Sequence, residues 1–164
     1  MFTKNKINRI LIKKTLAEKS PAPLVFSYEA DDQLHLNINT VKLTFFQYPF
    51  EVPDKVDFNG IIKIPSVLDL AAMKAFAFAQ RAKWKDYVDI YFILKNHNSL
   101  QQICKRTEEL FNTATSVVFT EKLFRQQLCY FTDINYSESV EFIAAPVPET
   151  EIKSFLTEIS VAPF

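Results

Sequence analysis

The stretch SVLDLAAMKAFAFAQRAKWKDYVDIYFIL, residues 66–94, decides the fold of this chain. It predicts two consecutive helices, over 66–82 and 87–95, that are apolar almost all the way round, as is typical of helices at the buried centre of a domain. The polar residues 81–85 predict a break between the two helices. Four charged residues stand inside this apolar frame: Lys74, Arg81, Asp86 and Asp89.

Lys74 has alanine and phenylalanine neighbours, among which a charge without a partner is costly. In one interpretation the side chain runs along the helix and reaches solvent. In another, Lys74 and Arg81 form a cationic strip that suits phosphate or an acidic partner, since seven residues separate two positions on nearly the same helix face. The residues alone leave both interpretations open.

Asp86 and Asp89 are three residues apart at the start of the second predicted helix. Asp86 can be the N-cap of that helix with Asp89 in its first turn, because both positions favour a carboxylate. Alternatively, the two residues form a carboxylate cluster near a metal ion or near the cationic strip. The two interpretations are compatible, because a capping carboxylate can also bind a ligand.

The residues before this stretch predict a helix and a small sheet. Apolar residues at helical spacing predict a helix over 4–18. From residue 24 the apolar residues alternate, which predicts three short strands in an antiparallel meander that ends at Tyr48 and Pro49. A polar loop over 51–59 and a short strand over 61–64 follow.

The C-terminal part predicts further helices over 100–111 and 120–131 and from Pro148 onward, with an irregular, acidic segment over 134–142. Ser66 is the predicted N-cap of the central stretch, with Asp69 in a capping-box position. The expected fold is α+β, with a small antiparallel meander packed on a helical bundle. We expect a single domain over 1–164, with helix and meander in about 1–50 and the helical part in about 60–164.

Composition narrows the class of protein. The chain has 164 residues, of which 48% are hydrophobic and 16 are Phe, enough for one domain with a dense aromatic core. No apolar run of about 18 residues is present, so no membrane span is expected. The 19 basic residues are balanced by 19 acidic ones, which argues against a strongly basic nucleic-acid surface.

Single residues exclude several kinds of site. Gly60 is the one glycine, whereas a P-loop or a dinucleotide fingerprint needs two or three. Cys104 and Cys129 have no CxxC partner and are expected to be reduced thiols of a cytoplasmic protein. His35 and His97 are isolated, so their spacing builds no zinc site.

The order of lysine, arginine and two aspartates, together with the block KDYVDIYFIL, resembles the C-terminal half of the bacterial AbiEii/AbiGii-type nucleotidyltransferase toxins. The resemblance covers most of the chain, since VKLTFFQYPF and LCYFTDI are also similar to segments of that family. It implies catalytic roles for Lys74, Asp86 and Asp89 and a substrate-binding role for Arg81. It further implies a nucleoside triphosphate bound with Mg²⁺, an acceptor such as RNA, and an antitoxin partner in a toxin–antitoxin system.

The chain departs from that family at its N-terminal side, because these residues contain neither the Gly-Ser turn nor the DxD strand that place the triphosphate and its metal ions. Thr44 stands in the third strand where an acidic residue would be expected. We therefore expect a truncated nucleotidyltransferase that is not catalytically competent alone. Without the strands of that region, the edge of the sheet would have unpaired backbone N–H and C=O groups, which favours homodimerisation.

The alternative is a non-catalytic module that retained the fold and binds a protein or RNA. The aromatic residues of FFQYPF, 45–50, would supply its contacts if they are exposed. In the other interpretation, this stretch is the tail of a strand and packs under the helices.

Overall fold

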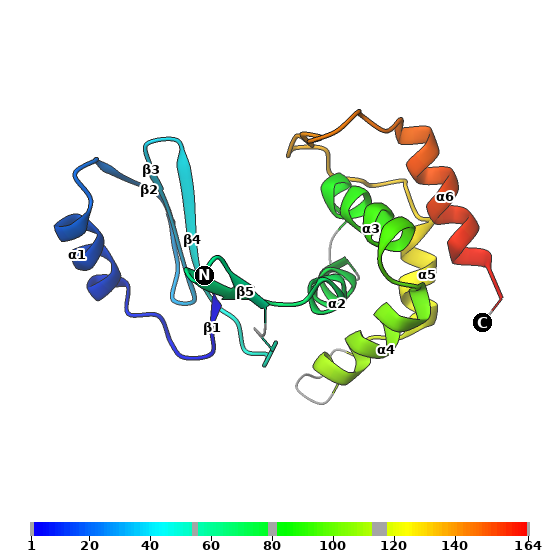
Figure 1. Cartoon of the computed structure of the whole chain (residues 1–164), viewed down its shortest axis with the longest axis horizontal. Coiled ribbons are helices and arrows are strands. Elements are labelled where there is room, and N and C mark those ends of the chain that lie inside the picture. The colour runs from blue at the N-terminus through cyan, green and yellow to red at the C-terminus, as the bar shows by residue number, and fades with distance from the viewer. Residues whose placement is uncertain (1, 54–55, 79–81, 113–117, 164) are drawn as a thin grey trace. The chain divides into compact units, whose positions relative to one another are not determined.

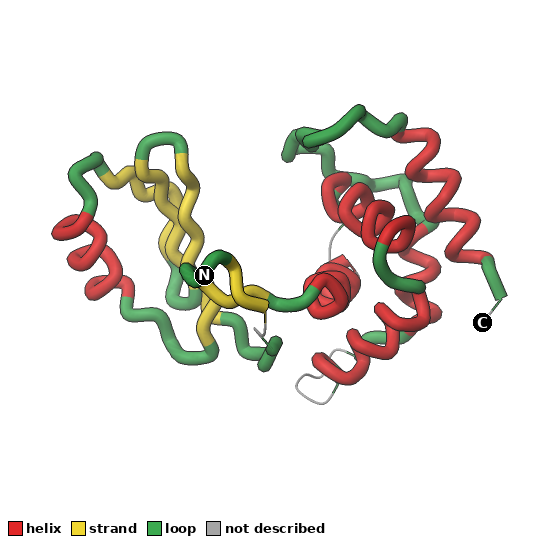
Figure 2. Tube along the Cα trace, viewed as in Figure 1, coloured by secondary structure: helices red, strands yellow, loops and turns green. Residues whose placement is uncertain are grey.

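The computed structural model describes residues 2–53, 56–78, 82–112 and 118–163 (Figure 1). Contacts divide the chain into two compact units, Met1–Glu51 and Val52–Phe164. Among these described residues, the first unit holds the sheet of the meander, and the second holds a hairpin and five helices (Figure 2). The α+β class is confirmed. The single domain, and the packing of the meander on the helices, stay predictions.

The first unit is a four-stranded sheet with one helix. The sheet order is β1-β4-β3-β2, and β2, β3 and β4 form the predicted antiparallel meander. The two-residue strand β1 pairs in parallel with β4 through Phe2 and Thr3, which the sequence did not predict. Strand β2 lies at the other edge of this sheet. The elements are β1 Phe2–Thr3, α1 Arg9–Lys19, β2 Leu24–Glu29, β3 Gln33–Ile38 and β4 Val41–Gln47.

A tight turn fixes the register of this sheet. Asn39 has a φ of 54° in the two-residue loop that pairs Ile38 with Val41, a conformation that asparagine tolerates better than most residues. This register puts Leu34 and Leu36 on one face, where both are fully buried. The apolar side of α1 covers that face through Ile12 and Leu16, joined by the buried Ile7 and by Leu24, Ile38, Leu43 and Phe45.

The predicted helix over 4–18 is wrong at its start. Helix α1 begins at Arg9, because the Asn8 side chain accepts a hydrogen bond of 3.0 Å from Leu11 N and caps it there. Residues before the cap instead supply β1 and the buried Ile7. Lys13 binds Glu29 of β2 at 2.5 Å, which ties the helix to the sheet edge.

The second unit begins with a hairpin and continues with helices. The predicted loop over 51–59 is wrong in part, because β5 pairs with β6 around the turn at Asn59 and Gly60, both at positive φ. The elements are β5 Val56–Phe58, β6 Ile62–Ile64, α2 Val67–Phe78, α3 Trp84–Asn96, α4 Leu100–Phe111, α5 Glu121–Leu128 and α6 Glu149–Val161. Helix α4 has the predicted bounds, which confirms that prediction.

Helix α2 is the centre of the helical unit, as its sequence predicts. Ser66 Oγ accepts a hydrogen bond from Asp69 N, which confirms the predicted cap. Helix α2 contacts α3, α4 and α5. Its Phe76 stacks on Phe111 of α4 and its Phe78 packs edge-on against Tyr87 of α3, each with ring centroids 4.4 Å apart. Among the described residues, no helix combines the length and the apolar character that crossing a membrane requires.

Candidate functional site

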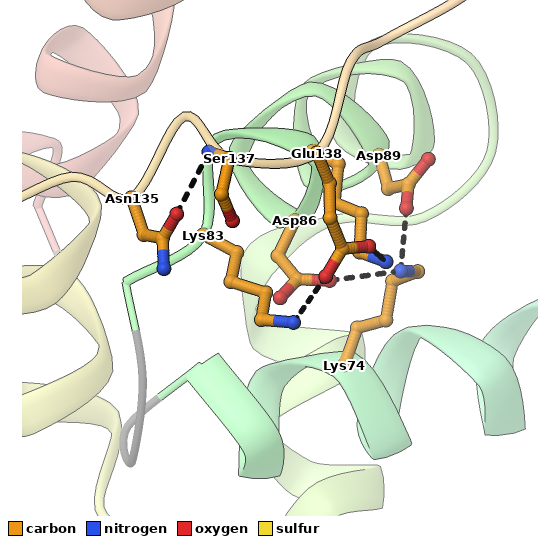
Figure 3. A network of polar contacts seen from close by, with 8 residues as sticks. Lys74, Lys83, Asp86, Asp89, Asn135, Ser137 and Glu138 are labelled. Carbon is orange, nitrogen blue, oxygen red and sulfur yellow. Dashed lines mark hydrogen bonds and ion pairs between the residues drawn. The ribbon is translucent and has the colours of Figure 1, made fainter. Parts of the chain in front are cut away.

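Two aspartates of α3 bind the ammonium group of Lys74. Lys74 is a residue in the middle of α2. Lys74 Nζ donates a hydrogen bond of 3.1 Å to Asp86 Oδ1 and forms a second ion pair with the Asp89 carboxylate. Figure 3 shows both carboxylates directed at this one ammonium group. We call Lys74, Asp86 and Asp89 the Lys74 cluster. The structure thus brings together the three residues that the family resemblance implies to be catalytic.

The three side chains of the Lys74 cluster differ in how far they are exposed to solvent. The side chain of Asp86 is 2% exposed, that of Lys74 32% and that of Asp89 47%. Burial lowers the pKa of Lys74, but hydrogen bonds and charge from Asp89 and Asp86 outweigh it, so that the pKa lies above its ordinary value of 10.5. Lys74 is therefore cationic at neutral pH, and Asp89 is the carboxylate that solvent reaches most easily.

The N-cap interpretation of Asp86 is wrong. Helix α3 begins at Trp84 with Lys83 as its cap, so that Asp86 lies in the first turn and Asp89 one turn further on. The carboxylate of Asp86 still interacts favourably with the dipole at the start of α3. Its side chain, however, points to Lys74 of the neighbouring helix.

The cationic strip is not what the structure shows for Lys74, because two carboxylates already neutralise its ammonium. The Lys74 cluster carries one positive and two negative charges, which makes it net negative. Arg81, the other member of the expected strip and the predicted substrate-binding residue, lies outside the described residues.

A second charge cluster lies at the start of α3. Lys83 Nζ donates to Glu138 Oε1 and Lys85 Nζ donates to Glu138 Oε2, so that each lysine binds one oxygen of a single carboxylate. We call these three residues the Glu138 cluster. The two lysines lower the pKa of Glu138 to about 2. The sequence marked this segment only as irregular and acidic, and it gave no signal for a partner more than 50 residues away.

Backbone hydrogen bonds attach the segment of Glu138 to the junction between α2 and α3. Asn135 N donates to Ala82 O at 2.7 Å, and Trp84 N donates to Asn135 O at 3.0 Å. The Asn135 side chain then accepts a hydrogen bond of 2.8 Å from Ser137 N (Figure 3). These contacts place Glu138 beside the first residues of α3.

A comparison with protein-family models matches residues 12–162 to the family described as nucleotidyl transferase AbiEii toxin, of a type IV toxin–antitoxin system. The match covers most of the chain, including both charge clusters. The chain belongs to the AbiEii toxin family. This membership confirms the resemblance on which the expected site residues were based.

A curated protein of Aquifex aeolicus strain VF5, called "Uncharacterized protein aq_aa25", is 30% identical to this AbiEii-family chain over 110 residues. The match covers 65% of this chain and 50% of the relative, so that the chain spans about half the length of the curated relative that it matches. No solved structure matches the chain.

The residues of the Lys74 cluster do not make a magnesium site by themselves. Among the described residues, no group of three or more histidine, cysteine, aspartate or glutamate side chains could hold a metal ion. Asp86 is buried against the Lys74 ammonium, and Asp89 binds the same group. Magnesium stays an expectation from the resemblance to the AbiEii family.

The aromatic residues of FFQYPF pack on one another. Phe46 and Tyr48 have ring centroids 5.9 Å apart, and Tyr48 meets Phe50 edge-on at 5.1 Å. All three side chains are half-buried, and burial raises the pKa of the Tyr48 hydroxyl to about 12. The aromatic side chains of this stretch thus pack on one another, and its packing under the helices stays a prediction.

The Glu138 cluster should make stability depend on pH in acid. Because its folded pKa is lowered, Glu138 stabilises the protein fully above its unfolded pKa of about 4.5, and this contribution is lost as pH falls through about 2. Half-exposed ion pairs of this kind contribute about 1 kcal/mol or less. We expect the urea midpoints of wild type and Glu138→Gln to differ above pH 5 and to converge as pH falls towards 2.

The exposed Glu141 of the same segment provides the matched control, and Glu141→Gln should follow wild type at every pH. A gap between wild type and Glu138→Gln that stays constant from pH 3 to pH 7 would show that Glu138 stabilises through its shape and not through its charge.

Proposed function

We propose that this chain supplies the Lys74–Asp86–Asp89 part of a nucleotidyltransferase active site in a toxin of the AbiEii family, and that it does not transfer a nucleotide alone. The observation that carries the proposal is the convergence of two carboxylates from α3 on one half-buried lysine of α2. Surface lysines do not need such an arrangement, whereas an active site uses it to hold a carboxylate in one geometry.

The different burial of the three residues of the Lys74 cluster supports a different proposed role for each of them. Asp86 is almost fully buried and cannot touch a substrate in this arrangement, so it positions Lys74. Lys74 in turn fixes Asp89, whose carboxylate is half-exposed. Asp89 is then the member of the cluster that faces the reacting groups, and Lys74 and Asp86 are its positioning residues.

The proposal that the chain is incompetent alone rests on charge. Transfer between a nucleoside triphosphate and an acceptor develops negative charge that cations must stabilise. The Lys74 cluster is net negative and by itself places no cation on a triphosphate, and Lys83 and Lys85 at the start of α3 are both paired with Glu138. An antitoxin partner stays a prediction from family membership, and a cytoplasmic location stays a prediction from the two cysteines.

The test is a transfer assay with labelled nucleoside triphosphates, magnesium chloride and total tRNA. We expect no labelled RNA from the chain alone. A fusion of the chain with the part of the Aquifex relative outside the matched 110 residues should label RNA. In that fusion Asp89→Asn should lower the rate by about 100-fold, the size of effect found when one electrostatic group of an active site is removed.

Lys122→Met, at an exposed position of α5, is the control for surface charge and should leave the rate unchanged. Labelling by the chain alone would contradict the proposed incompetence. An inactive, folded fusion would contradict the transferase role, and tRNA binding by the chain at low and moderate salt would then favour the non-catalytic RNA-binding module.

A further inference from the structure

Lys83 and Lys85 converge on a single anionic group. Each ammonium donates to a different oxygen of the Glu138 carboxylate, so the two cations bracket it. A phosphate group presents two oxygens in the same way and carries more negative charge than a carboxylate. Compact ammonium groups are ordinary phosphate ligands in proteins. The two lysines of the Glu138 cluster therefore have the geometry of an anion-binding site that a carboxylate of the same chain, that of Glu138, occupies.

Charge distinguishes these lysines from Lys74. Two aspartates neutralise Lys74, whereas Lys83 and Lys85 share one carboxylate, so that the Glu138 cluster keeps one net positive charge. When Glu138 leaves, the two lysines carry two positive charges, and among the described residues Glu138 is the carboxylate that pairs with both of them. Among the described residues of this region, Lys83 and Lys85 are thus better able than Lys74 to receive a phosphate.

Glu138 can leave without loss of the fold. Its side chain is 42% exposed, and it lies in the irregular segment between α5 and α6. The hydrogen bonds that anchor this segment are made by Asn135, three residues before it. Rotation of the Glu138 side chain therefore opens the two lysines and leaves the anchor in place.

We propose that Lys83 and Lys85 bind one phosphate group of a nucleoside triphosphate and that Glu138 occupies this site as an internal competitor until the nucleotide displaces it. The nucleotide as carrier of the phosphate rests on the proposed transferase function. The site itself does not, because it is defined by the two lysines and the carboxylate that they bind.

Binding of sodium tripolyphosphate to the full chain, measured by calorimetry, tests the proposal. Glu138→Gln removes the competing charge and keeps the side chain's shape, so its affinity should rise about tenfold, equivalent to about 1.4 kcal/mol. The control Glu141→Gln changes the net charge by the same amount in the same segment and should bind as wild type does. Lys83→Gln and Lys85→Gln, added to Glu138→Gln, should remove the gain.

Equal affinities of Glu138→Gln and Glu141→Gln would overturn the proposal. If Glu138→Gln fails to fold, Lys83→Gln with Lys85→Gln in the wild-type background serves instead, and undiminished tripolyphosphate binding by that variant would overturn it as well. A gain seen with an RNA oligonucleotide but not with tripolyphosphate would overturn the assignment to a nucleotide. Tripolyphosphate binding without any transfer by the fusion would contradict the transferase function and leave the phosphate site standing.

Discussion

Replacing Lys74 with Met is expected to lower the free energy of unfolding by about 2 kcal/mol, because it removes the charged hydrogen bond from Lys74 to the nearly buried Asp86 carboxylate. Asp86 is 2% exposed, so water does not replace the lost ion pair. Urea unfolding at neutral pH measures the change. The methionine keeps the length and apolar stem of the side chain, so the expected loss reflects charge more than packing.

The double substitution Lys74→Met with Asp86→Asn should recover part of the loss, because it removes both charges of the Lys74–Asp86 ion pair instead of one. Asp89→Asn is the matched control: it removes the other carboxylate at Lys74, which is 47% exposed, and should cost less than about 1 kcal/mol. A loss from Asp89→Asn as large as that from Lys74→Met would contradict the assignment of the energy to the buried pair.

The ion pair of Lys74 and Asp86 should also make the stability of the protein depend on pH in alkaline solution. The pKa of Lys74 is raised in the folded state, so its contribution is fully present below the unfolded value of 10.5 and is lost as pH rises through the higher folded value. The stability gap between wild type and Lys74→Met should therefore stay constant from neutral pH to about pH 10 and narrow only above it.

Local patterns in the sequence were sufficient for much of the fold. The N-cap at Ser66 and the bounds of α4 follow from residues a few positions apart, and the structure confirms both. The meander follows from the two-residue alternation and the turn at Asn39. The order of Lys74, Asp86 and Asp89 pointed to three residues that the structure brings together, because the helices α2 and α3 are consecutive in the chain.

The parts that sequence reasoning missed depend on pairing between distant residues. Strand β1 has two residues and exists only through its parallel pairing with β4, so no local period marks it. Glu138 reaches Lys83 across 55 residues, and its neighbours predicted only an irregular segment. Asp86 looked like a cap because caps favour aspartate, and only the packing of α3 on α2 shows that it binds Lys74 instead.

Replacing Arg125 with Met is expected to lower the free energy of unfolding by about 3 kcal/mol, because this buried guanidinium of α5 binds both the Glu121 carboxylate and the carbonyl end of α6. Its Nη1 donates to the carbonyl oxygens of Ser160 at 3.3 Å and Ala162 at 2.8 Å, and also to Ile159 O. A cation at this end of a helix also interacts favourably with the helix dipole. Urea unfolding measures the loss.

Arg125→Lys separates charge from geometry. One ammonium keeps the positive charge but cannot reach Glu121 and the α6 carbonyls with the fixed fork of a guanidinium, so this variant should lose about 1–2 kcal/mol. Hydrogen exchange should rise most in the last turn of α6, where Ala162 N donates to Ile159 O. Lys122→Met, on the exposed side of the same helix, should change stability by less than about 0.5 kcal/mol. Full stability of Arg125→Lys would show that charge alone holds α5 to α6, since the lysine keeps the charge and loses the bidentate geometry.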